Sequence, residues 1–188
     1  NQVALRDLLD YLDEPWKSMA ARGCGAGHLG FFNPIGVTRP DTVEADGHTA
    51  AAKPDGLARM LLDPYGIDIA VLTGGVYGYS SHPDPDFAAA VCRAYNDYML
   101  EHWLPRDERF RLAINVSTRD PELAAREIER AGAHPKVVEV MLSSAATAPL
   151  GQRMFHPLYA AAEKMGLPVA LHPGHEGTGV STAPSAVG

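Results

Sequence analysis

Four short apolar runs, separated by segments with helical patterning, limit the fold of this chain more than any other feature. The runs cover residues 67–73, 110–116, 137–142 and 169–172. Short apolar runs bounded by turn residues are typical of strands that are buried on both faces, as in parallel sheets. Each strand–helix unit covers about 25–40 residues, the size of a right-handed βαβ crossover. The sequence therefore predicts an α/β fold with four parallel strands, in either a doubly wound sheet or part of a (β/α)8 barrel.

Helices are expected between these strands and before the first one. Their predicted ranges are 3–13, 54–62, 84–103, 121–131 and 155–165. Asp84-Pro85 and Asp120-Pro121 each combine an N-cap residue with a proline in the first turn. Pro64 is expected to end the second helix. Gly166 is expected to end the last one before the final strand.

Residues 23–56 are rich in Gly, Pro, Thr and Asp and show no sustained period. A loop of this length inside a compact domain is often functional. Arg39 in this loop could bind a substrate carboxylate, because a guanidinium offers two parallel donors. The alternative is an ordinary solvated loop charge.

The composition excludes several functional classes. The formal net charge is −7 and no cluster of Lys and Arg is present, so neither nucleic acid nor an anionic membrane surface is an expected partner. No apolar run reaches the ~20 residues of a membrane-spanning helix, and no signal-peptide pattern opens the chain. Cys24 and Cys92 are isolated, which favours a reducing, cytoplasmic setting.

Several candidate site residues follow from the predicted strand ends. His172 is the last residue of the final strand, and the carboxyl ends of parallel strands face the catalytic mouth. Imidazole is the commonest protein metal ligand, so His172 is either a metal or catalytic residue or a histidine bound to a loop carbonyl. His175 and Glu176 lie in the loop that follows, and could orient ligands, contact substrate or simply be solvated. His82 follows the first strand and is a candidate substrate contact at the same rim.

Several segments, taken in order, carry a resemblance to a known family. They are residues 84–98 (DPDFAAAVCRAYNDY), 103–105 (WLP), 109–111 (RFR), 119–121 (RDP), 155–163 (FHPLYAAAE) and 167–177 (LPVALHPGHEG). Over about residues 55–180 this order resembles the amidohydrolase-related proteins of the aminocarboxymuconate-semialdehyde decarboxylase group. The resemblance implies a metal-dependent (β/α)8 barrel. In that family the first strand carries a His-x-His metal pair, the fifth and sixth strands each a histidine, and the eighth an aspartate.

With this numbering the four strands are the second to the fifth of the barrel, and His172 matches the fifth-strand metal ligand. The resemblance thus implies one domain over residues 1–188, a barrel incomplete at both ends with about four of its strands. The remaining ligands are expected upstream and downstream of the chain.

The resemblance also implies a divalent metal, with zinc as the expected ion, and a small-molecule substrate. The expected function is hydrolysis of an amide, ester or lactone, with His175 and Glu176 as candidate catalytic residues. One alternative is a metal-dependent, non-oxidative decarboxylase of an aromatic or enoic acid. Another is a catalytically inactive barrel that serves as a binding protein. Assembly into a homo-oligomer is left open.

Overall fold

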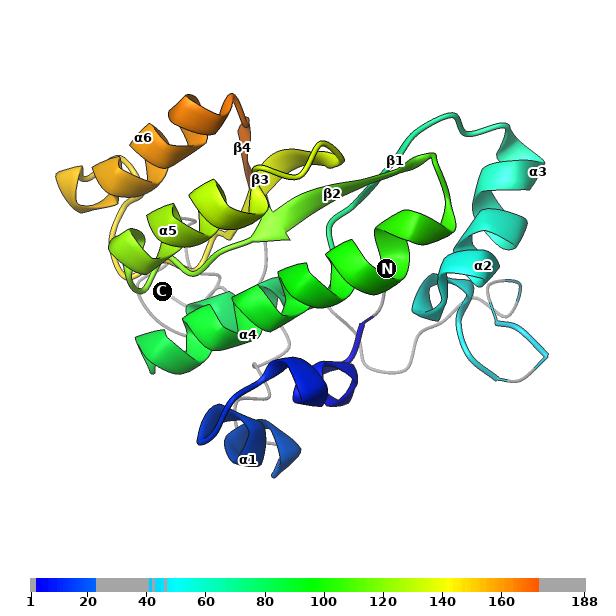
Figure 1. Ribbon diagram of the computed structural model, residues 1–188, viewed down its shortest axis with the longest axis horizontal. Helices are drawn as coiled ribbons and strands as arrows, with labels where there is room; N and C mark the ends of the chain where they lie inside the picture. Colours follow the sequence, from blue (N-terminus) through cyan, green and yellow to red (C-terminus); the bar gives the residue numbers. More distant parts are fainter. Residues whose placement is uncertain (1–2, 23–40, 42, 46, 173–188) are drawn as a thin grey trace, which may run out of the picture.

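The computed structural model describes residues 3–22, 41, 43–45 and 47–172 of the chain. Its strands are β1 (Ala70–Leu72), β2 (Phe110–Asn115), β3 (Val137–Ser143) and β4 (Val169–His172). They form one parallel sheet in the order β1-β2-β3-β4 (Figure 1). A doubly wound sheet reverses its strand order at a switch point, whereas a barrel adds each strand beside the previous one. The sequential order therefore confirms the prediction of an incomplete (β/α)8 barrel.

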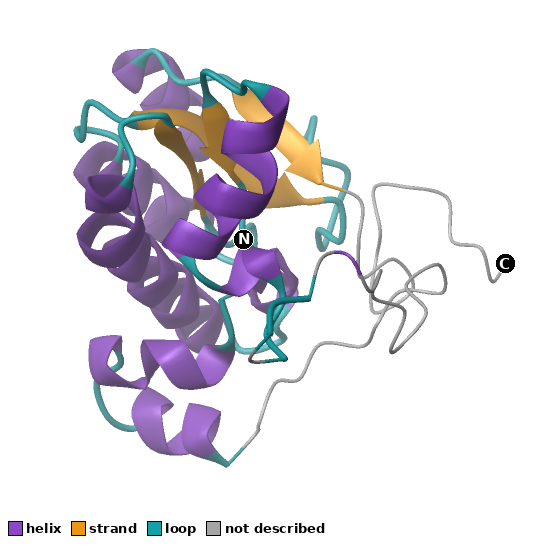
Figure 2. Cartoon of the chain, turned by 90° about the vertical axis from the view of Figure 1, so that its right-hand side faces the viewer, coloured by secondary structure: helices purple, strands orange, loops and turns teal. Residues whose placement is uncertain are grey.

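Six α-helices occur in the described part of the chain, and shorter 3-10 and π segments flank them. The α-helices are α1 (Trp16–Ala21), α2 (Pro54–Leu57), α3 (Asp63–Tyr65), α4 (Pro85–Tyr98), α5 (Pro121–Ala131) and α6 (His156–Met165). The 3-10 segments are η1 (Leu5–Tyr11), η3 (Ala50–Ala52), η5 (Val76–Ser81), η7 (Leu104–Arg106) and η8 (Arg153–Phe155), and the π segments are η4 (Ala58–Leu62) and η6 (Met99–Trp103). Helices α4 and α5 lie against the same face of the sheet (Figures 1 and 2). This one-sided layer is what right-handed crossovers between neighbouring parallel strands produce.

The predicted starts of the two central helices are confirmed by their capping bonds. The Asp84 carboxylate accepts hydrogen bonds from the main-chain N–H groups of Asp86 and Phe87, at 3.0 and 3.1 Å. Asp120 makes the equivalent pair of bonds at the start of α5, both at 2.9 Å. Each cap satisfies N–H groups that the first turn of a helix leaves without partners.

Three predicted boundaries differ from the structure. The second helix does not stop before Pro64 but continues through α2, η4 and α3 to Tyr65. Pro64 follows directly after the π segment η4, where the regular α-helical bonding pattern is already interrupted. Gly66 ends the helix with a φ of 60°, and the chain then leaves through a bond from Ile67 N–H to the Leu62 carbonyl. The strand predicted from residue 67 consequently begins only at Ala70. The first helix is a 3-10 helix, shorter than the predicted 3–13.

The hydrophobic core fills the space between the sheet and its helices. Leu112 and Ile114 of β2, and Val140 of β3, are fully buried there with Ile128 of α5. Since side chains alternate along a strand, Ala113 and Asn115 lie on the opposite face of β2. That opposite face corresponds to the inside of a barrel. Within the described residues, no helix is long and apolar enough to cross a membrane.

Candidate active site

The carboxyl-end edge of the sheet, together with the loops that follow the strands, collects buried polar side chains. They are Ser80, Ser81, Asn115, Ser117, Thr118, Ser143 and Ser144. Polar groups are buried at a cost unless they form hydrogen bonds. Because these buried polar side chains gather at the carboxyl-end edge, this edge is the candidate active site.

His172 lies at this edge, as predicted. It is the last residue of β4 and pairs in register with Ser143 of β3, and Ser144 N–H donates to the His172 carbonyl at 3.0 Å. Paired residues in a parallel sheet share a face, so His172 and Ser143 lie on the face opposite Leu142, which belongs to the helix-side core. The half-buried His172 thus belongs to the inner face of the barrel, at the carboxyl ends of its strands.

The described residues alone do not build a metal centre. In residues 3–22, 41, 43–45 and 47–172, no group of three or more His, Cys, Asp or Glu side chains could hold an ion. His172 supplies an imidazole donor in a suitable place, and a zinc-type site needs about three protein ligands. The donor set therefore fits a metal only if other parts of the protein provide the co-ligands, and metal binding by His172 stays a prediction.

His82 has a structural role in the start of α4. Its Nδ1 accepts a hydrogen bond from Asp84 N–H at 3.1 Å, which leaves the proton of the neutral ring on Nε2. The half-buried ring packs edge-on against Phe87, with 4.8 Å between the ring centroids. These contacts account for the residue without a ligand, and its predicted contact with substrate is untested. The other three candidates, Arg39, His175 and Glu176, lie outside the described residues.

Arg119 is a residue of this edge that sequence reasoning missed. Its Nε donates to the Ser81 carbonyl at 2.9 Å, and its Nη2 donates to the same oxygen. Ser117 Oγ donates to the Ser80 carbonyl at 2.6 Å, so the loop after β2 is bonded to η5 at two points. Burial lowers the pKa of the Arg119 guanidinium, which forms no ion pair within the described part of the chain. The sequence offers Arg119 only as part of the Arg-Asp-Pro triplet, one segment of the family resemblance, whose Asp-Pro pair predicts a helix start.

Asn115 ends β2 on the inner face, in register with Met141. Its Nδ2 donates to the Thr73 carbonyl at 3.1 Å, across to the chain that follows β1. Its Oδ1 is buried and, among the described residues, accepts no hydrogen bond. Nothing in the sequence pattern separates this asparagine from an ordinary strand-end residue.

Comparison with known proteins identifies the family. The amidohydrolase family model matches residues 26–187, which include all four strands and His172. The chain belongs to the amidohydrolase family. The resemblance noted from the sequence is thereby confirmed.

Among curated proteins, this amidohydrolase is similar to two gamma-resorcylate decarboxylases. The one from Polaromonas sp. (strain JS666 / ATCC BAA-500) is 28% identical over 120 residues, which are 60% of this chain and 37% of the relative. The one from Rhodococcus jostii (strain RHA1) is 26% identical over 123 residues, again 60% of this chain and 37% of the relative. The aligned part is thus little more than a third of the length of each relative.

This chain is also similar to solved structures of decarboxylases. A 5-carboxyvanillate decarboxylase from Sphingomonas paucimobilis is 26% identical with a TM-score of 0.58, over 65% of this chain and 36% of that one. Another, from Novosphingobium aromaticivorans DSM 12444, covers all of this chain and 50% of its own, with a TM-score of 0.67 and 22% identity. That crystal contains manganese and 4-hydroxy-3-methoxy-5-nitrobenzoic acid. At 22% identity this likeness supports the barrel fold alone.

Proposed function

We propose that the full-length protein containing this chain is a metal-dependent, non-oxidative decarboxylase of a hydroxylated aromatic acid. The observation that carries the proposal is the position of His172 on the inner face, at the carboxyl end of β4. The relatives named above, which are decarboxylases of two such acids, supply the reaction class. They favour the decarboxylase alternative over the expected hydrolysis of an amide, ester or lactone.

In the proposed reaction the bond between the ring and its carboxylate breaks, carbon dioxide leaves, and the ring carbon takes up a proton. A divalent metal would supply positive charge that orients the acid and stabilises negative charge in the transition state. His172 would hold that metal through one imidazole nitrogen, together with ligands from the remainder of the barrel. Manganese in the structural neighbour supports a divalent ion, while zinc is still only the expectation from sequence.

The described rim residues would shape the mouth rather than perform chemistry. Ser117 and Arg119 fasten the loop after β2 to η5, so both loops keep one arrangement around the mouth. We retain His82 and Arg39 as proposed substrate contacts. We retain His175 and Glu176 as proposed catalytic groups, one of which would deliver the proton to the ring carbon.

The test uses the full-length protein, with metal analysis and assays of carbon dioxide release from gamma-resorcylate and from 5-carboxyvanillate. The wild type is expected to contain metal in stoichiometric amount and to release carbon dioxide from at least one acid. His172→Ala is expected to bind the metal at least tenfold more weakly and to lose at least 100-fold in kcat/KM. His156→Ala is the matched control, because His156 is exposed at the start of α6.

Three results would contradict the proposal. A wild-type protein without bound metal would favour the inactive, binding barrel. Hydrolysis of substrates in an amide, ester and lactone panel, without carbon dioxide release from either acid, would support the hydrolase function expected from the sequence. Unchanged metal content in His172→Ala would remove His172 from the ligand set.

A further inference from the structure

A network of hydrogen bonds connects helix α4 to the end of strand β2. Asn96 of α4 donates through Nδ2 to the Asn115 carbonyl at 3.0 Å and accepts from Asn115 N–H through Oδ1 at 2.9 Å. Both residues are fully buried. Strand β1 has already ended at Leu72, whose partner is Leu112, so it does not reach these groups of β2. The Asn96 carboxamide therefore replaces a neighbouring strand at this point.

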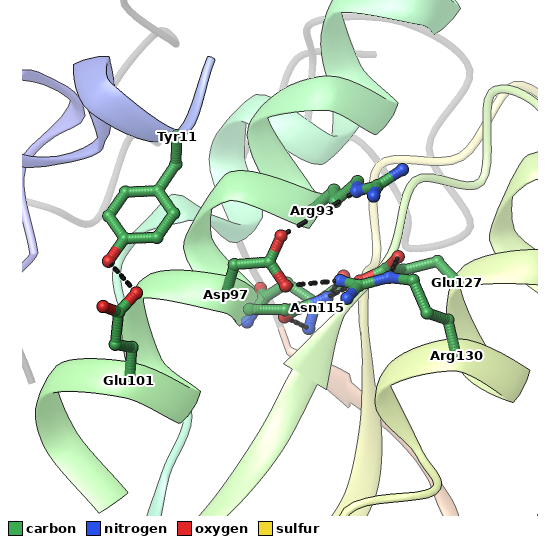
Figure 3. Close-up of polar contacts among 8 residues, drawn as sticks. Tyr11, Arg93, Asp97, Glu101, Asn115, Glu127 and Arg130 are labelled. Atoms are coloured by element: carbon green, nitrogen blue, oxygen red, sulfur yellow. Dashed lines mark hydrogen bonds and ion pairs between the residues drawn. The ribbon is translucent and has the colours of Figure 1, made fainter. Parts of the chain in front are cut away.

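The hydrogen-bond network continues into helix α5. The second Nδ2 proton of Asn96 goes to Glu127 Oε1 at 2.7 Å. Arg130 donates to both oxygens of Glu127 at 2.8 Å and also pairs with Asp97 of α4 at 2.7 Å. Figure 3 shows this line of contacts from Arg93 and Asp97 through Arg130 and Glu127 toward Asn115. The hydrogen bonds that Arg130 donates raise the pKa of its guanidinium, so the side chain stays positively charged at any physiological pH.

The chemistry of the pair fixes the orientation of the amide. A carboxylate only accepts, so Glu127 requires the nitrogen of the Asn96 amide to face it. The same nitrogen can then reach the Asn115 carbonyl, and the amide oxygen is left to accept from Asn115 N–H. The hydrogen bond from Asn96 to Glu127 is charge-assisted, which makes it stronger than a neutral one.

From Asn115 the contacts lead directly to the rim. The Asn115 side chain holds the carbonyl of Thr73, where the segment toward η5 begins. The loop after β2 starts at the next residue, and its Ser117 and Arg119 are bonded to η5. A shift of the Asn115 main chain would therefore move both rim loops together, while His172 lies two strands away on β4.

We propose that Asn96 and Glu127 are positioning residues that hold the end of β2, and through it the two rim loops, in the arrangement that binds the aromatic acid. The inference rests on the proposed decarboxylase function, which supplies the substrate. A change in Asn96 or Glu127 is therefore expected to alter the affinity for substrate and to leave metal binding unchanged. Neither residue contacts substrate, since both lie in the layer between the sheet and its helices.

The test compares three variants of the full-length protein at a temperature well below unfolding. In Glu127→Leu the Asn96 amide loses the acceptor that orients it. In Glu127→Gln the side-chain oxygen can still accept from Asn96, so this variant is the conservative rescue. Arg109→Leu removes the ion pairs with Asp107 and Asp63 at the opposite end of the sheet, and so controls for lost stability.

Glu127→Leu is expected to raise KM for the active acid about tenfold or more, with kcat changed less than threefold and metal content unchanged. Glu127→Gln is expected to stay within threefold of the wild type in KM, and Arg109→Leu to leave KM unchanged. Amide hydrogen exchange at residues 115–120 should be faster by tenfold or more in Glu127→Leu alone. The inference is overturned if Glu127→Leu and Arg109→Leu show the same KM and the same exchange at these residues.

The exchange measurement separates this inference from the proposed function. If the wild-type protein releases no carbon dioxide, the decarboxylase proposal fails and the exchange at residues 115–120 alone decides whether the pair holds the end of β2. If the enzyme is active but exchange and KM do not respond to Glu127→Leu, only the positioning role is wrong.

Discussion

The Asn96 side chain pairs with both main-chain groups of Asn115, in the way that a neighbouring strand would. This relationship joins helix α4 to the end of strand β2, which a rim loop follows. A carboxamide is suited to the place because it offers one donor and one acceptor side by side.

Asn96→Leu is expected to lower the free energy of unfolding by roughly 2–5 kcal/mol, because a buried N–H and a buried C=O each lose their partner. Urea unfolding of the variant and the wild type measures the difference. Arg93→Leu is a control on the same helix, since Arg93 is mostly exposed and its ion pair with Asp97 is long. A loss below about 1 kcal/mol for Asn96→Leu would show that water replaces the amide.

Gly74→Ala is expected to be more costly than Gly66→Ala, although both glycines have a positive φ, of 73° and 60°. A Cβ at Gly74 would overlap the side chain of the buried Tyr95, whereas a Cβ at Gly66 meets nothing within 4 Å. Gly66→Ala should therefore cost about 1 kcal/mol in strain, and Gly74→Ala about 1–3 kcal/mol more from overpacking. Thermal and urea unfolding of the two variants test this, and equal losses would contradict it.

The ion pair between Asp107 and Arg109 predicts a pH dependence of stability. Hydrogen bonds from Arg109 lower the pKa of Asp107 from 3.8 to about 2. A carboxylate with a lowered pKa in the folded state stabilises the protein above its unfolded pKa, and this contribution is lost as the pH falls toward the folded pKa. The stability difference between the wild type and Asp107→Asn should be constant above about pH 4 and shrink between about pH 4 and 2.

Urea unfolding of both proteins between pH 2 and 6 provides the measurement. Arg59→Gln is a useful control, because its contact with Glu44 lies outside this ion-pair group. A difference that stays the same at pH 2 would show that the Asp107–Arg109 contact is not formed in solution.

Asp120→Ala is expected to lower stability by about 0.5–2 kcal/mol, because the first turn of α5 loses the acceptor for two N–H groups. Asp120→Asn keeps an accepting oxygen and should recover most of the loss. Urea unfolding distinguishes the two variants. Equal losses for both would mean that the carboxylate acts through its charge at the helix N-terminus instead.

The sequence predicted the local elements well where short-range physics governs them. Asp-Pro pairs start α4 and α5 as expected, since the cap and the proline act within one turn. The same local reasoning failed at Pro64, because the helix passes through this residue directly after the π segment η4, where the regular bonding is already interrupted. The predicted strand from residue 67 was too long because Gly66 and Ile67 are used in leaving the preceding helix.

The candidate site was predictable only in part. His172 could be placed at a strand end, since a Pro-Gly pair follows it directly. Arg119 and Asn115 could not be found, because their partners, Ser81 and Thr73, lie about 40 residues away in the chain and no spacing pattern connects them.

By itself, the sequence determined that the chain alternates strands and helices, that its strands run parallel, and that a histidine ends the last of them. These features depend on periodicity and turn chemistry, which act between near neighbours. Strand spacing left both a doubly wound sheet and a barrel open, and the barrel that the family resemblance implies was confirmed by the tertiary structure, because strand order depends on which edge each strand joins. Only the tertiary structure decided which polar side chains meet at the rim, since contacts between distant segments exist only once the strands are side by side.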